Sequence, residues 1–435
     1  MELSLPYTSL GPATLKIKRS QYRYFLLVGY VYFFFNSFML PDGLLYTVLL
    51  SPVFLYWLMV KKAPVVRCVS IFLFCWIPML VIHYSNGISM TAYLKSSVLY
   101  FTVFLFGMTV YTYFKYYSFT YEPIMERVLK LNFLFVVVCV FLLLADKSGV
   151  VWSVTDISEG VSDFPRLRML TYEPSYYSLL LIPSFLFYFQ FIFYRTITRK
   201  QWILLATVII SLGLSLSYGA IFISLLTLGL FVFYNFFSNM RRRQNKRFLV
   251  FLSVMLVIGA GLVLTLFADS GFVLRILNIF EGNDSSINNR SSQAYFLATS
   301  IAGLKSTLFG VGPGQLKILG EDLISLVYAF SNDDPGQMAR IPSSMADLLA
   351  TFGWVGFSVK LLTELILFRK TRVKRSSFRL CLFIFMFIYQ FVGSFSTNIV
   401  EIFFWVLAFS PVFPDSYFQR KDPLPAEEIP AIPEQ

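Results

Sequence analysis

Two arginines and one glutamate stand close together where a polar stretch of the chain runs into an apolar one. Residues 164–178 read Phe-Pro-Arg-Leu-Arg-Met-Leu-Thr-Tyr-Glu-Pro-Ser-Tyr-Tyr-Ser, which places Arg166 and Arg168 shortly before Glu173. Charged side chains at a membrane face are costly unless they bind a ligand or one another. This segment therefore predicts a site that holds an anion and keeps a carboxylate base beside it.

Further arginines lie in the polar stretch 268–343. They are Arg275, Arg290 and Arg340. The polar stretches 146–173 and 268–343 together contain more arginines than lysines. Arginine presents a planar fork that binds phosphate through two hydrogen bonds, so this choice favours a diphosphate ligand. The alternative is that these arginines contact lipid headgroups or pair with nearby acidic residues. We expect Arg290 to act together with Arg166 or Arg168.

Glu173 directly precedes Pro174, and proline is a favoured first residue of a helix. As a general base Glu173 would deprotonate a sugar hydroxyl. The alternative is that the carboxylate is only stabilised by the helix dipole. Tyr172 and Tyr176 would stack on sugars, although aromatic residues are also typical of membrane interfaces. The sequence leaves these alternatives open.

Other polar residues lie inside or beside apolar runs. Ser217 belongs to the segment Ser-Leu-Ser-Tyr-Gly-Ala, which favours close helix packing and would otherwise line a pocket that faces outward. Lys360 and Glu364 have i, i+4 spacing, so we expect them to pair within the bundle. His83 is the only histidine and is expected to be an interfacial polar residue. No metal site and no cofactor are predicted.

The composition indicates an all-α polytopic membrane protein. Of the 435 residues, 57% are hydrophobic and only 14% are charged, against roughly a quarter in soluble domains. The mean hydropathy is +0.68. Apolar runs of about 20 residues recur along the chain, as transmembrane helices require. Twelve spans are predicted, at about 24–40, 43–60, 67–84, 92–114, 129–145, 174–194, 201–217, 219–237, 248–267, 344–367, 379–394 and 397–413.

The net charge of +12 follows the predicted topology. About 26 of the 36 lysines and arginines fall on one face if the spans alternate, which is the positive-inside bias. Both termini are then cytoplasmic, and this distribution argues against nucleic-acid binding. The basic clusters lie at the N-terminus and at 61–67, 115–130, 195–200, 241–247, 369–379 and 420–421.

The predicted organisation is a transmembrane domain with two long outward loops. The domain covers 24–413, after a cytoplasmic segment 1–23 and before a disordered cytoplasmic tail 414–435. The loops cover 146–173 and 268–343. The second is expected to fold as short helices on the membrane surface, including one at 291–304, where Ala294, Leu297, Ile301 and Leu304 share a face.

Four segments, taken in order, resemble the bacterial O-antigen polymerase/ligase superfamily of the Wzy and WaaL type. Residues 168–176 resemble its Arg-x-x-Gly-x-x-Glu-Pro-(Ser/Asn) segment at the start of a central span. Residues 215–220 resemble its Ser-Arg-Gly helix break. Residues 289–314 resemble the Arg…Pro-Leu-x-Gly-x-Gly stretch of its large periplasmic loop, and residues 344–356 resemble the start of the next span. The resemblance covers about 164–357.

The resemblance implies a GT-C-like fold in the bacterial cytoplasmic membrane, with the site facing the periplasm. It implies an enzyme that polymerises undecaprenyl-diphosphate-linked oligosaccharides into O-antigen or a similar polysaccharide, with Glu173 and Arg290 as catalytic residues. Tyr218 replaces the family arginine, so one phosphate contact is absent. A histidine that ligases carry is also missing near 341–346, which favours a polymerase.

Two alternatives remain at this point. One is a ligase that transfers glycan to lipid A-core, and the other is a flippase of lipid-linked oligosaccharides. The expected partners are the lipid-linked oligosaccharides and membrane lipids, with a chain-length regulator protein as a further candidate and no nucleic acid. Sugar identity and linkage cannot be read from these residues.

Overall fold

The computed structural model describes residues 19–35, 46–60, 63–145, 149, 151–154, 165–171, 173–238, 289–328 and 341–419. Within these ranges the chain is mainly helical. The only sheet found in these ranges has two antiparallel strands, β1 (Trp152–Val154) and β2 (Pro165–Leu167). Two 3₁₀ turns, η2 (Ser118–Thr120) and η3 (Val373–Arg375), separate longer helices.

The helices keep the order of the apolar runs. In chain order they are α1 (Arg19–Phe35), α2 (Tyr46–Val60), α3 (Val65–Ser85), α4 (Met90–Tyr117), α5 (Tyr121–Leu144), α6 (Pro174–Phe193), α7 (Arg199–Ser215), α8 (Tyr218–Ser238), α12 (Ser292–Gly303), α13 (Leu316–Leu319), α14 (Glu321–Tyr328), α15 (Ser344–Lys370), α16 (Ser377–Tyr389), α17 (Ile399–Phe409) and α18 (Asp415–Phe418).

The apolar helices identify an α-helical, multi-pass membrane protein. By length and composition, five helical segments of the described ranges are able to cross a membrane: Val65–Ser85, Met90–Leu144, Pro174–Phe193, Tyr218–Asn235 and Ser344–Arg375. Four shorter apolar helices accompany them. The expected span 248–267 and parts of both predicted loops lie outside the described residues. The number of twelve spans and the orientation therefore stay predictions.

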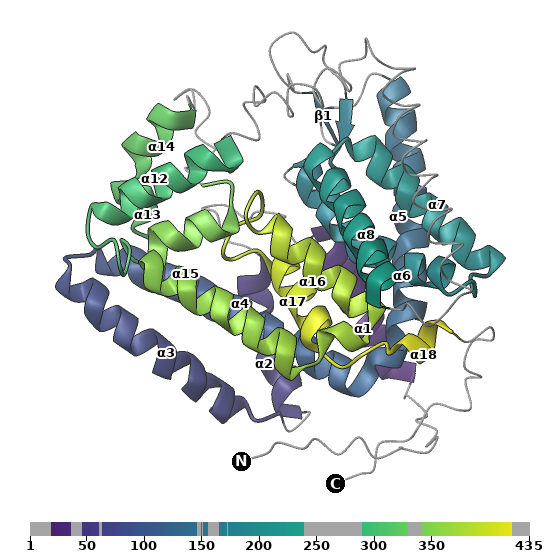
Figure 1. Ribbon diagram of the computed structural model, residues 1–435, viewed down its shortest axis with the longest axis horizontal. Helices are drawn as coiled ribbons and strands as arrows, with labels where there is room; N and C mark the ends of the chain where they lie inside the picture. Colours follow the sequence, from purple (N-terminus) through teal and green to yellow (C-terminus); the bar gives the residue numbers. More distant parts are fainter. Residues whose placement is uncertain are drawn as a thin grey trace.

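Helix α6 is the centre of the molecule. It packs against α7, α8, α16 and α17, and most of its side chains are buried, including Leu181, Leu186 and Phe187, which are fully buried. In Figure 1, α5, α7 and α8 lie on one side of the centre, and α3, α4 and α15 lie on the other. Helices α12 to α14 gather over one end of α15 (Figure 1). Because packed neighbours surround α6, its first residue is held by the core of the protein.

The connection between α4 and α5 is shorter than the sequence predicts. The span expected from 129 starts as a helix at Tyr121, so most of the segment 115–128 between the two predicted spans is helical. Glu126 explains part of this difference, because it forms ion pairs with Lys130 at 2.7 Å and Lys200 at 2.6 Å. The pair with Lys130 has i, i+4 spacing, which supports a helix that polar composition alone does not suggest.

Helix α15 is broken at Gly353, whose φ of 64° and ψ of −166° are not helical. A broken helix leaves backbone groups that must find other partners, above all inside a membrane. Here the segment 307–312 supplies them through four hydrogen bonds. They join Val311 N–H to Ala350 O (3.0 Å), Gly312 N–H to Thr351 O (2.9 Å), Trp354 N–H to Thr307 O (3.2 Å) and Val355 N–H to Leu308 O (3.0 Å).

Glycines make this contact possible. A Cβ at Gly310, whose φ is +72°, would lie 2.5 Å from the Thr351 carbonyl, and a Cβ at Gly353 would lie 2.3 Å from Leu308. Glycine is the residue that permits such close approach of two backbones. We call segment 307–314 and the break at Gly353 the glycine clamp. Thus the glycines of this motif serve packing between two backbones.

The glycine clamp also holds the turn between α3 and α4. Gln315 accepts from Ser89 N–H at 2.9 Å and donates to Ser89 O at 3.0 Å. His83 is fully buried and its Nε2 lies 2.8 Å from Phe309 O. The histidine is therefore an internal anchor of the clamp near the end of α3, and its expected place at the membrane interface stays a prediction.

The predicted helix at 291–304 is present as α12. Ala294, Leu297 and Ile301 are buried against α15, as the shared face predicts. Leu304 follows the helix as its C-terminal cap and is 50% exposed. Its expected place on the buried face was wrong because the helix ends one residue earlier.

Candidate functional site

Glu173 lies at the start of α6, with an extended backbone (φ −149°, ψ 155°). Its side chain makes no capping hydrogen bond to the helix backbone. Instead, the Ser175 hydroxyl donates to Glu173 Oε1. The carboxylate therefore lies at the start of a buried helix and makes no capping hydrogen bond. Stabilisation by the helix dipole needs no such bond, so that alternative stays open.

Arg166 and Arg168 lie on a short hairpin that the sequence did not predict. Alternation along β2 buries Leu167 completely and places the two arginines on the opposite face. Trp152 on β1 donates from Nε1 to Cys139 O at 2.8 Å, which fixes the hairpin to α5. The hairpin therefore presents two arginines together from a rigid base.

The two arginines have different surroundings. Arg166 Nε donates to Ser215 O at 3.4 Å, at the end of α7. Arg168 donates from its guanidinium to Gly149 O at 3.2 Å. The Thr171 hydroxyl lies 2.6 Å from Arg168 O and 2.9 Å from Glu173 O. This threonine connects the arginine hairpin to the glutamate.

Arg290 comes from a distant part of the chain, just before α12. Its charge and the charge of Glu173 both act on the phenol of Tyr389, the last residue of α16. Tyr389 is 5% exposed. The carboxylate of Glu401 on α17 acts on the same phenol. An arginine and two carboxylates from separate segments therefore lie within electrostatic reach of one buried hydroxyl, and the catalytic roles of Glu173 and Arg290 stay predictions.

The connection 390–398, between α16 and α17, touches both sides of this arrangement. On one side Tyr176 stacks on Phe395, with ring centroids 6.3 Å apart. On the other side Tyr295 of α12 donates from its hydroxyl to Phe391 O at 3.4 Å. We define the mouth as Glu173, the arginine hairpin, Arg290, Tyr389 and the connection 390–398.

Tyr295 lies beside the mouth and is a neutral hydrogen-bond donor to Phe391 of the connection 390–398. Burial raises the pKa of its phenol, although the hydrogen bond with the Ser343 hydroxyl works in the opposite direction. Ser343 in turn donates to Phe391 O at 3.1 Å. A phenol held in its protonated form can donate to a ligand oxygen at neutral pH.

Ser217 lies at the helix break between α7 and α8 but does not face an open surface. Ser217 is 3% exposed, and its carbonyl accepts a hydrogen bond from Ile221 N–H at 3.0 Å. The neighbouring Ser215 hydroxyl lies 2.6 Å from that of Ser178, which joins α7 to α6. The segment therefore serves helix packing in this structure, and the predicted ligand-binding role of Ser217 requires a rearrangement.

Three predicted site residues cannot be located. Tyr172, Arg275 and Arg340 lie outside the described residues. Of the other six, Arg166, Arg168, Glu173 and Arg290 are part of the mouth as defined, Tyr176 contacts it through Phe395, and Ser217 is buried at the helix break.

Sequence analysis missed the part of the mouth that comes from the connection 390–398. A signal was present, because Gly393, Ser394, Ser396 and Asn398 interrupt two apolar runs with small polar residues. The predicted spans 379–394 and 397–413 leave only two residues between them. Nothing in the pattern indicated that the charges of Arg290 and Glu173 would both act on Tyr389.

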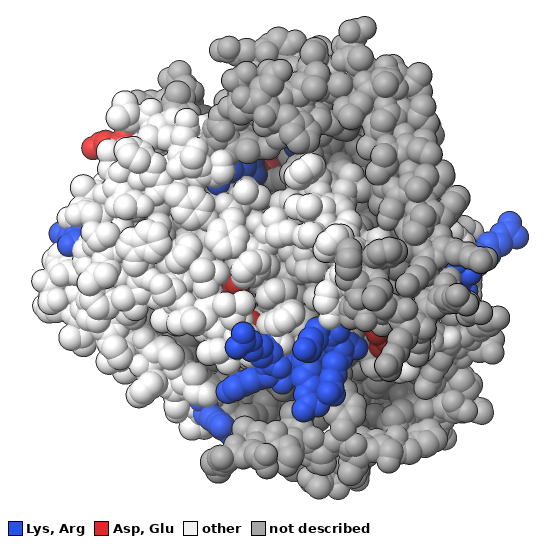
Figure 2. Space-filling model, in the orientation of Figure 1, with Lys and Arg blue, Asp and Glu red and all other residues white. Residues whose placement is uncertain are grey.

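Charge is distributed unevenly over the described surface. Figure 2 shows a dense basic patch over the end of α15 and η3, where Arg369, Lys370, Arg372, Lys374 and Arg375 are exposed. A smaller group of basic and acidic side chains is visible on the same face, between α12 and β1 (Figure 2). The ion pairs found among the described residues join Lys130 and Lys200 to Glu126 and Lys360 to Glu401, so none of them involves Arg290.

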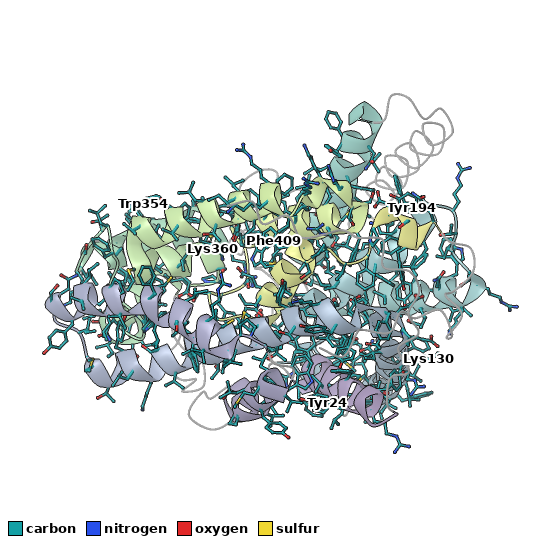
Figure 3. All side chains as sticks on the ribbon, turned by 90° about the horizontal axis from the view of Figure 1, so that it is seen from below. Tyr24, Lys130, Tyr194, Trp354, Lys360 and Phe409 are labelled. Carbon is teal, nitrogen blue, oxygen red and sulfur yellow. The ribbon has the colours of Figure 1, made fainter. Side chains whose placement is uncertain are left out.

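Lys360 has a different partner from the expected one. It forms an ion pair with Glu401 of α17 at 2.6 Å, whereas Glu364 accepts from Gln390 at 2.9 Å. The prediction of a Lys360–Glu364 pair was wrong because α17 packs close enough to bring a second carboxylate to the lysine. In Figure 3, Lys360 lies among the helices, whereas Trp354 lies at the outer edge of the molecule.

The described residues contain no group of three or more histidine, cysteine, aspartate or glutamate side chains that would hold a metal ion. What the mouth offers is cationic guanidinium, neutral phenol and carboxylate at one end of a helical bundle. Comparison of the chain with family models, with curated proteins and with solved structures finds no match.

Proposed function

We propose that the protein is a membrane glycosyltransferase that polymerises undecaprenyl-diphosphate-linked oligosaccharides into O-antigen or a related surface polysaccharide. The observation that supports this most strongly is the approach of Arg290 and Glu173 to Tyr389. A glycosyl transfer from a lipid diphosphate needs positive charge at the leaving group and a base at the acceptor. The mouth holds both kinds of group on separate, well-packed elements.

Arg290 would neutralise the departing diphosphate. Negative charge grows on the diphosphate as the glycosidic bond breaks, and preorganised donors are most effective where charge develops. The guanidinium forks of Arg166 and Arg168 would contact the phosphates or the first sugar from the hairpin side. Arg290 is free of an ion pair among the described residues, so binding an anion would cost no existing salt bridge.

Glu173 would take the proton of the acceptor hydroxyl. A general base must lie within hydrogen-bond reach of that hydroxyl in the bound complex. The Ser175 hydroxyl now occupies Glu173 Oε1, and a sugar hydroxyl would compete for this acceptor or use the other oxygen. The oxygen atom of the acceptor then bonds to the anomeric carbon, and the lipid diphosphate leaves with the bonding electron pair.

The resemblance segments also support the proposal by their contacts. Arg166, two residues before segment 168–176, donates to Ser215 O of segment 215–220. Segments 289–314 and 344–356 interlock in the glycine clamp. Segments that are far apart in the chain and share one family pattern would be expected to form one functional unit.

A flippase is the second candidate, because one observation favours it. Lys360, Glu364 and Glu401 are ionisable residues inside the helical bundle, and such residues often mark transport pathways. The ligase alternative changes only the acceptor, and no contact in the mouth distinguishes it.

Purified protein in liposomes tests these candidates. We expect preformed lipid-linked repeats to yield polymer in the presence of the wild-type protein. Movement of the lipid-linked repeats across the bilayer without polymer would establish the flippase instead. Transfer to added lipid A-core without chain growth would establish the ligase. In cells, deletion should leave single-repeat glycans and remove the long-chain ladder.

The proposed orientation has its own test. In a cysteine-free chain, Gly303→Cys on α12 should react with an impermeant thiol reagent in intact spheroplasts. Lys374→Cys in the basic patch should react only after the membrane is broken. Labelling of the Lys374 position from outside would place the mouth on the cytoplasmic side, where a periplasmic polymerase cannot work.

A further inference from the structure

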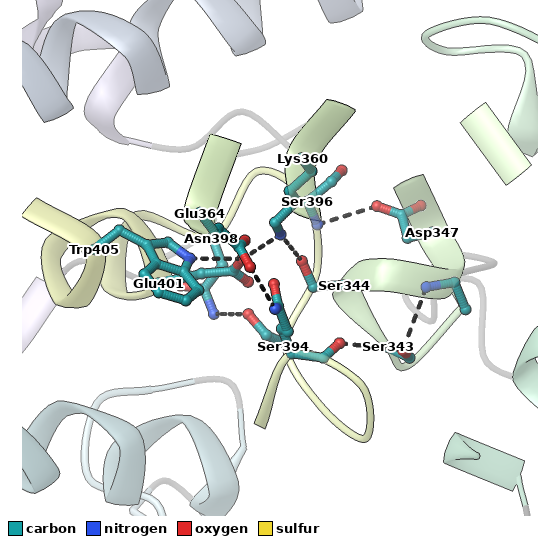
Figure 4. Close-up of polar contacts among 12 residues, drawn as sticks. Ser343, Ser344, Asp347, Lys360, Glu364, Ser394, Ser396, Asn398, Glu401 and Trp405 are labelled. Atoms are coloured by element: carbon teal, nitrogen blue, oxygen red, sulfur yellow. Dashed lines mark hydrogen bonds and ion pairs between the residues drawn. The ribbon is translucent and has the colours of Figure 1, made fainter. Parts of the chain in front are cut away.

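A second charged cluster lies inside the helical bundle and shares Gln390 with the mouth. We call Lys360, Glu364, Gln390 and Glu401 the buried cluster; Figure 4 shows the contacts of Lys360, Glu364 and Glu401. Lys360 Nζ bonds Glu401 Oε1 at 2.6 Å and the Ser344 hydroxyl at 3.2 Å. Three elements contribute: α15, α17 and the residue that follows α16.

The charges of the buried cluster do not balance. One ammonium faces two carboxylates, and the charges of Lys360 and Glu401 both act on Glu364. Glu364 is 4% exposed and Glu401 is 3% exposed. A net negative charge in a low-dielectric interior is strongly unfavourable unless a further positive charge compensates it.

Three oxygen atoms of the cluster also lack donors. Glu364 Oε1, Gln390 Oε1 and Glu401 Oε2 are buried and have no hydrogen-bond partner among the described residues. Gln390 is fully buried and donates from Nε2 to Glu364 Oε2, so its amide end lies within the cluster. Buried acceptors without donors are rare, and each calls for a proton, a water molecule or an ion. The missing charge and the unsatisfied oxygens therefore point to the same kind of ligand.

We propose that the buried cluster binds one additional monovalent cation, either H⁺ or Na⁺. A proton on either carboxyl would neutralise the cluster and donate to one of the unsatisfied oxygens. A sodium ion would neutralise it and be coordinated by carboxylate and amide oxygens, which are hard ligands. Two carboxylates already paired with one lysine offer too little charge for a divalent ion.

A cation bound at this site would affect the order of the mouth through Gln390. Its carbonyl accepts from Met345 N–H at 3.1 Å, and its side chain belongs to the buried cluster. Gln390 directly follows Tyr389 and begins the connection 390–398. A cation that orders the Gln390 side chain therefore orders the element that joins both sides of the mouth. The site stands independently of the proposed glycan chemistry.

Thermal unfolding of purified protein in lipid nanodiscs tests the sodium form. Na⁺ is exchanged against N-methyl-D-glucamine at constant ionic strength. If the cluster binds Na⁺, Tm should rise by roughly 2 °C for each tenfold increase in Na⁺ above its Kd. Glu364→Gln removes one negative charge while keeping the shape, so its Tm should not respond. Glu126→Gln removes the same charge from ion pairs outside the cluster and should respond like the wild type.

Infrared spectroscopy tests the proton form. A proton held by the cluster gives a carbonyl band of a protonated carboxylic acid, which should be absent in Glu364→Gln or in Glu401→Gln. The wild-type band should fade as pH rises through the pKa of the protonated carboxyl, and Tm should fall as pH approaches that pKa from below, because the folded state there binds more protons than the unfolded state. Glu126→Gln should retain both changes.

A wild-type protein with neither a Na⁺-dependent Tm nor a protonated-carboxyl band would overturn the proposal. The same conclusion follows if Glu364→Gln and Glu401→Gln both respond to Na⁺ and pH as the wild type does. Should either variant fail to fold, the wild-type measurements and the other variant still decide the outcome. None of these readouts needs a glycan substrate, so failure here is distinct from failure of the polymerase assay.

Discussion

The mouth and the buried cluster both bring charged residues together from segments far apart in the chain, but they treat those charges differently. Lys360 is held by Glu401 and by the Ser344 hydroxyl. Arg290 in the mouth belongs to none of the ion pairs found among the described residues. The ammonium of Lys360 is committed to internal contacts, whereas the mouth leaves a guanidinium available.

This difference teaches how to read charges in a membrane protein. A charge that is satisfied by its own chain contributes mainly to stability or to conformational specificity. A charge that is preorganised but unpaired is better suited to a ligand. We therefore expect substitutions in the buried cluster to change folding, and substitutions in the mouth to change turnover with little effect on folding.

The largest effect is expected from Lys360→Met. It leaves two carboxylates in the bundle without a counter-charge, which should lower the free energy of unfolding by about 3–5 kcal/mol. The double variant Lys360→Met/Glu401→Gln should recover part of this loss, because one carboxylate is removed with the lysine. Thermal unfolding and yield in membranes measure both. A Lys360→Met protein as stable as the wild type would show that the ion pair is not important.

Arg290→Lys and Glu173→Gln should abolish most turnover while the protein accumulates normally. The lysine keeps the charge but loses the bidentate fork, and loss of one preorganised donor typically costs about a hundredfold in rate. Glutamine keeps the shape of Glu173 and removes the base. Arg369→Lys in the exposed basic patch is the matched control and should polymerise normally. Normal polymer from both mouth variants would mean that the site is elsewhere.

Gly310→Ala tests whether close backbone approach in the glycine clamp stabilises the protein. The added Cβ would meet the Thr351 carbonyl at 2.5 Å and requires a positive φ. We expect a loss of about 2 kcal/mol in stability. Gly303→Ala is the control, since its Cβ meets no atom within 4 Å and should change stability by less than about 0.5 kcal/mol. Equal melting temperatures for the two variants would contradict a role for close backbone approach.

The smallest effect is expected at the ion pairs of Glu126. Lys130 and Lys200 are each 61% exposed, and such pairs contribute about 0.2–1 kcal/mol. Glu126→Gln should therefore lower Tm only slightly, and the difference from wild type should shrink further in high salt. A large loss that salt leaves unchanged would show that Glu126 has a structural role like that of the buried cluster.

Local pattern was enough to predict several elements. Pro174 after Glu173 marks the start of α6, and the apolar spacing at 291–304 marks α12. Both predictions succeed because helix starts and helix faces depend on residues within one or two turns. The arginine hairpin was not predicted, because β2 is three residues long and gains its stability from Leu167 and from contacts of Trp152 with α5.

Only part of the mouth was predictable. Arg166, Arg168, Glu173 and Tyr176 were recognised because they are neighbours in the sequence. Their relation to Tyr389 was not, since it depends on how α6, α12 and α16 pack together.

By itself, the sequence determined the class of the protein: its apolar runs require burial in a membrane, and its helix signals act over a few residues. The tertiary structure alone decided that Lys360 pairs with Glu401 and not with Glu364, and that the glycines of 307–314 close on the break at Gly353. The physical reason is the separation along the chain over which each interaction acts. Hydrophobicity and helix propensity act along the chain, whereas the partner of a buried charge or of a freed backbone group depends on which distant segment packs against it.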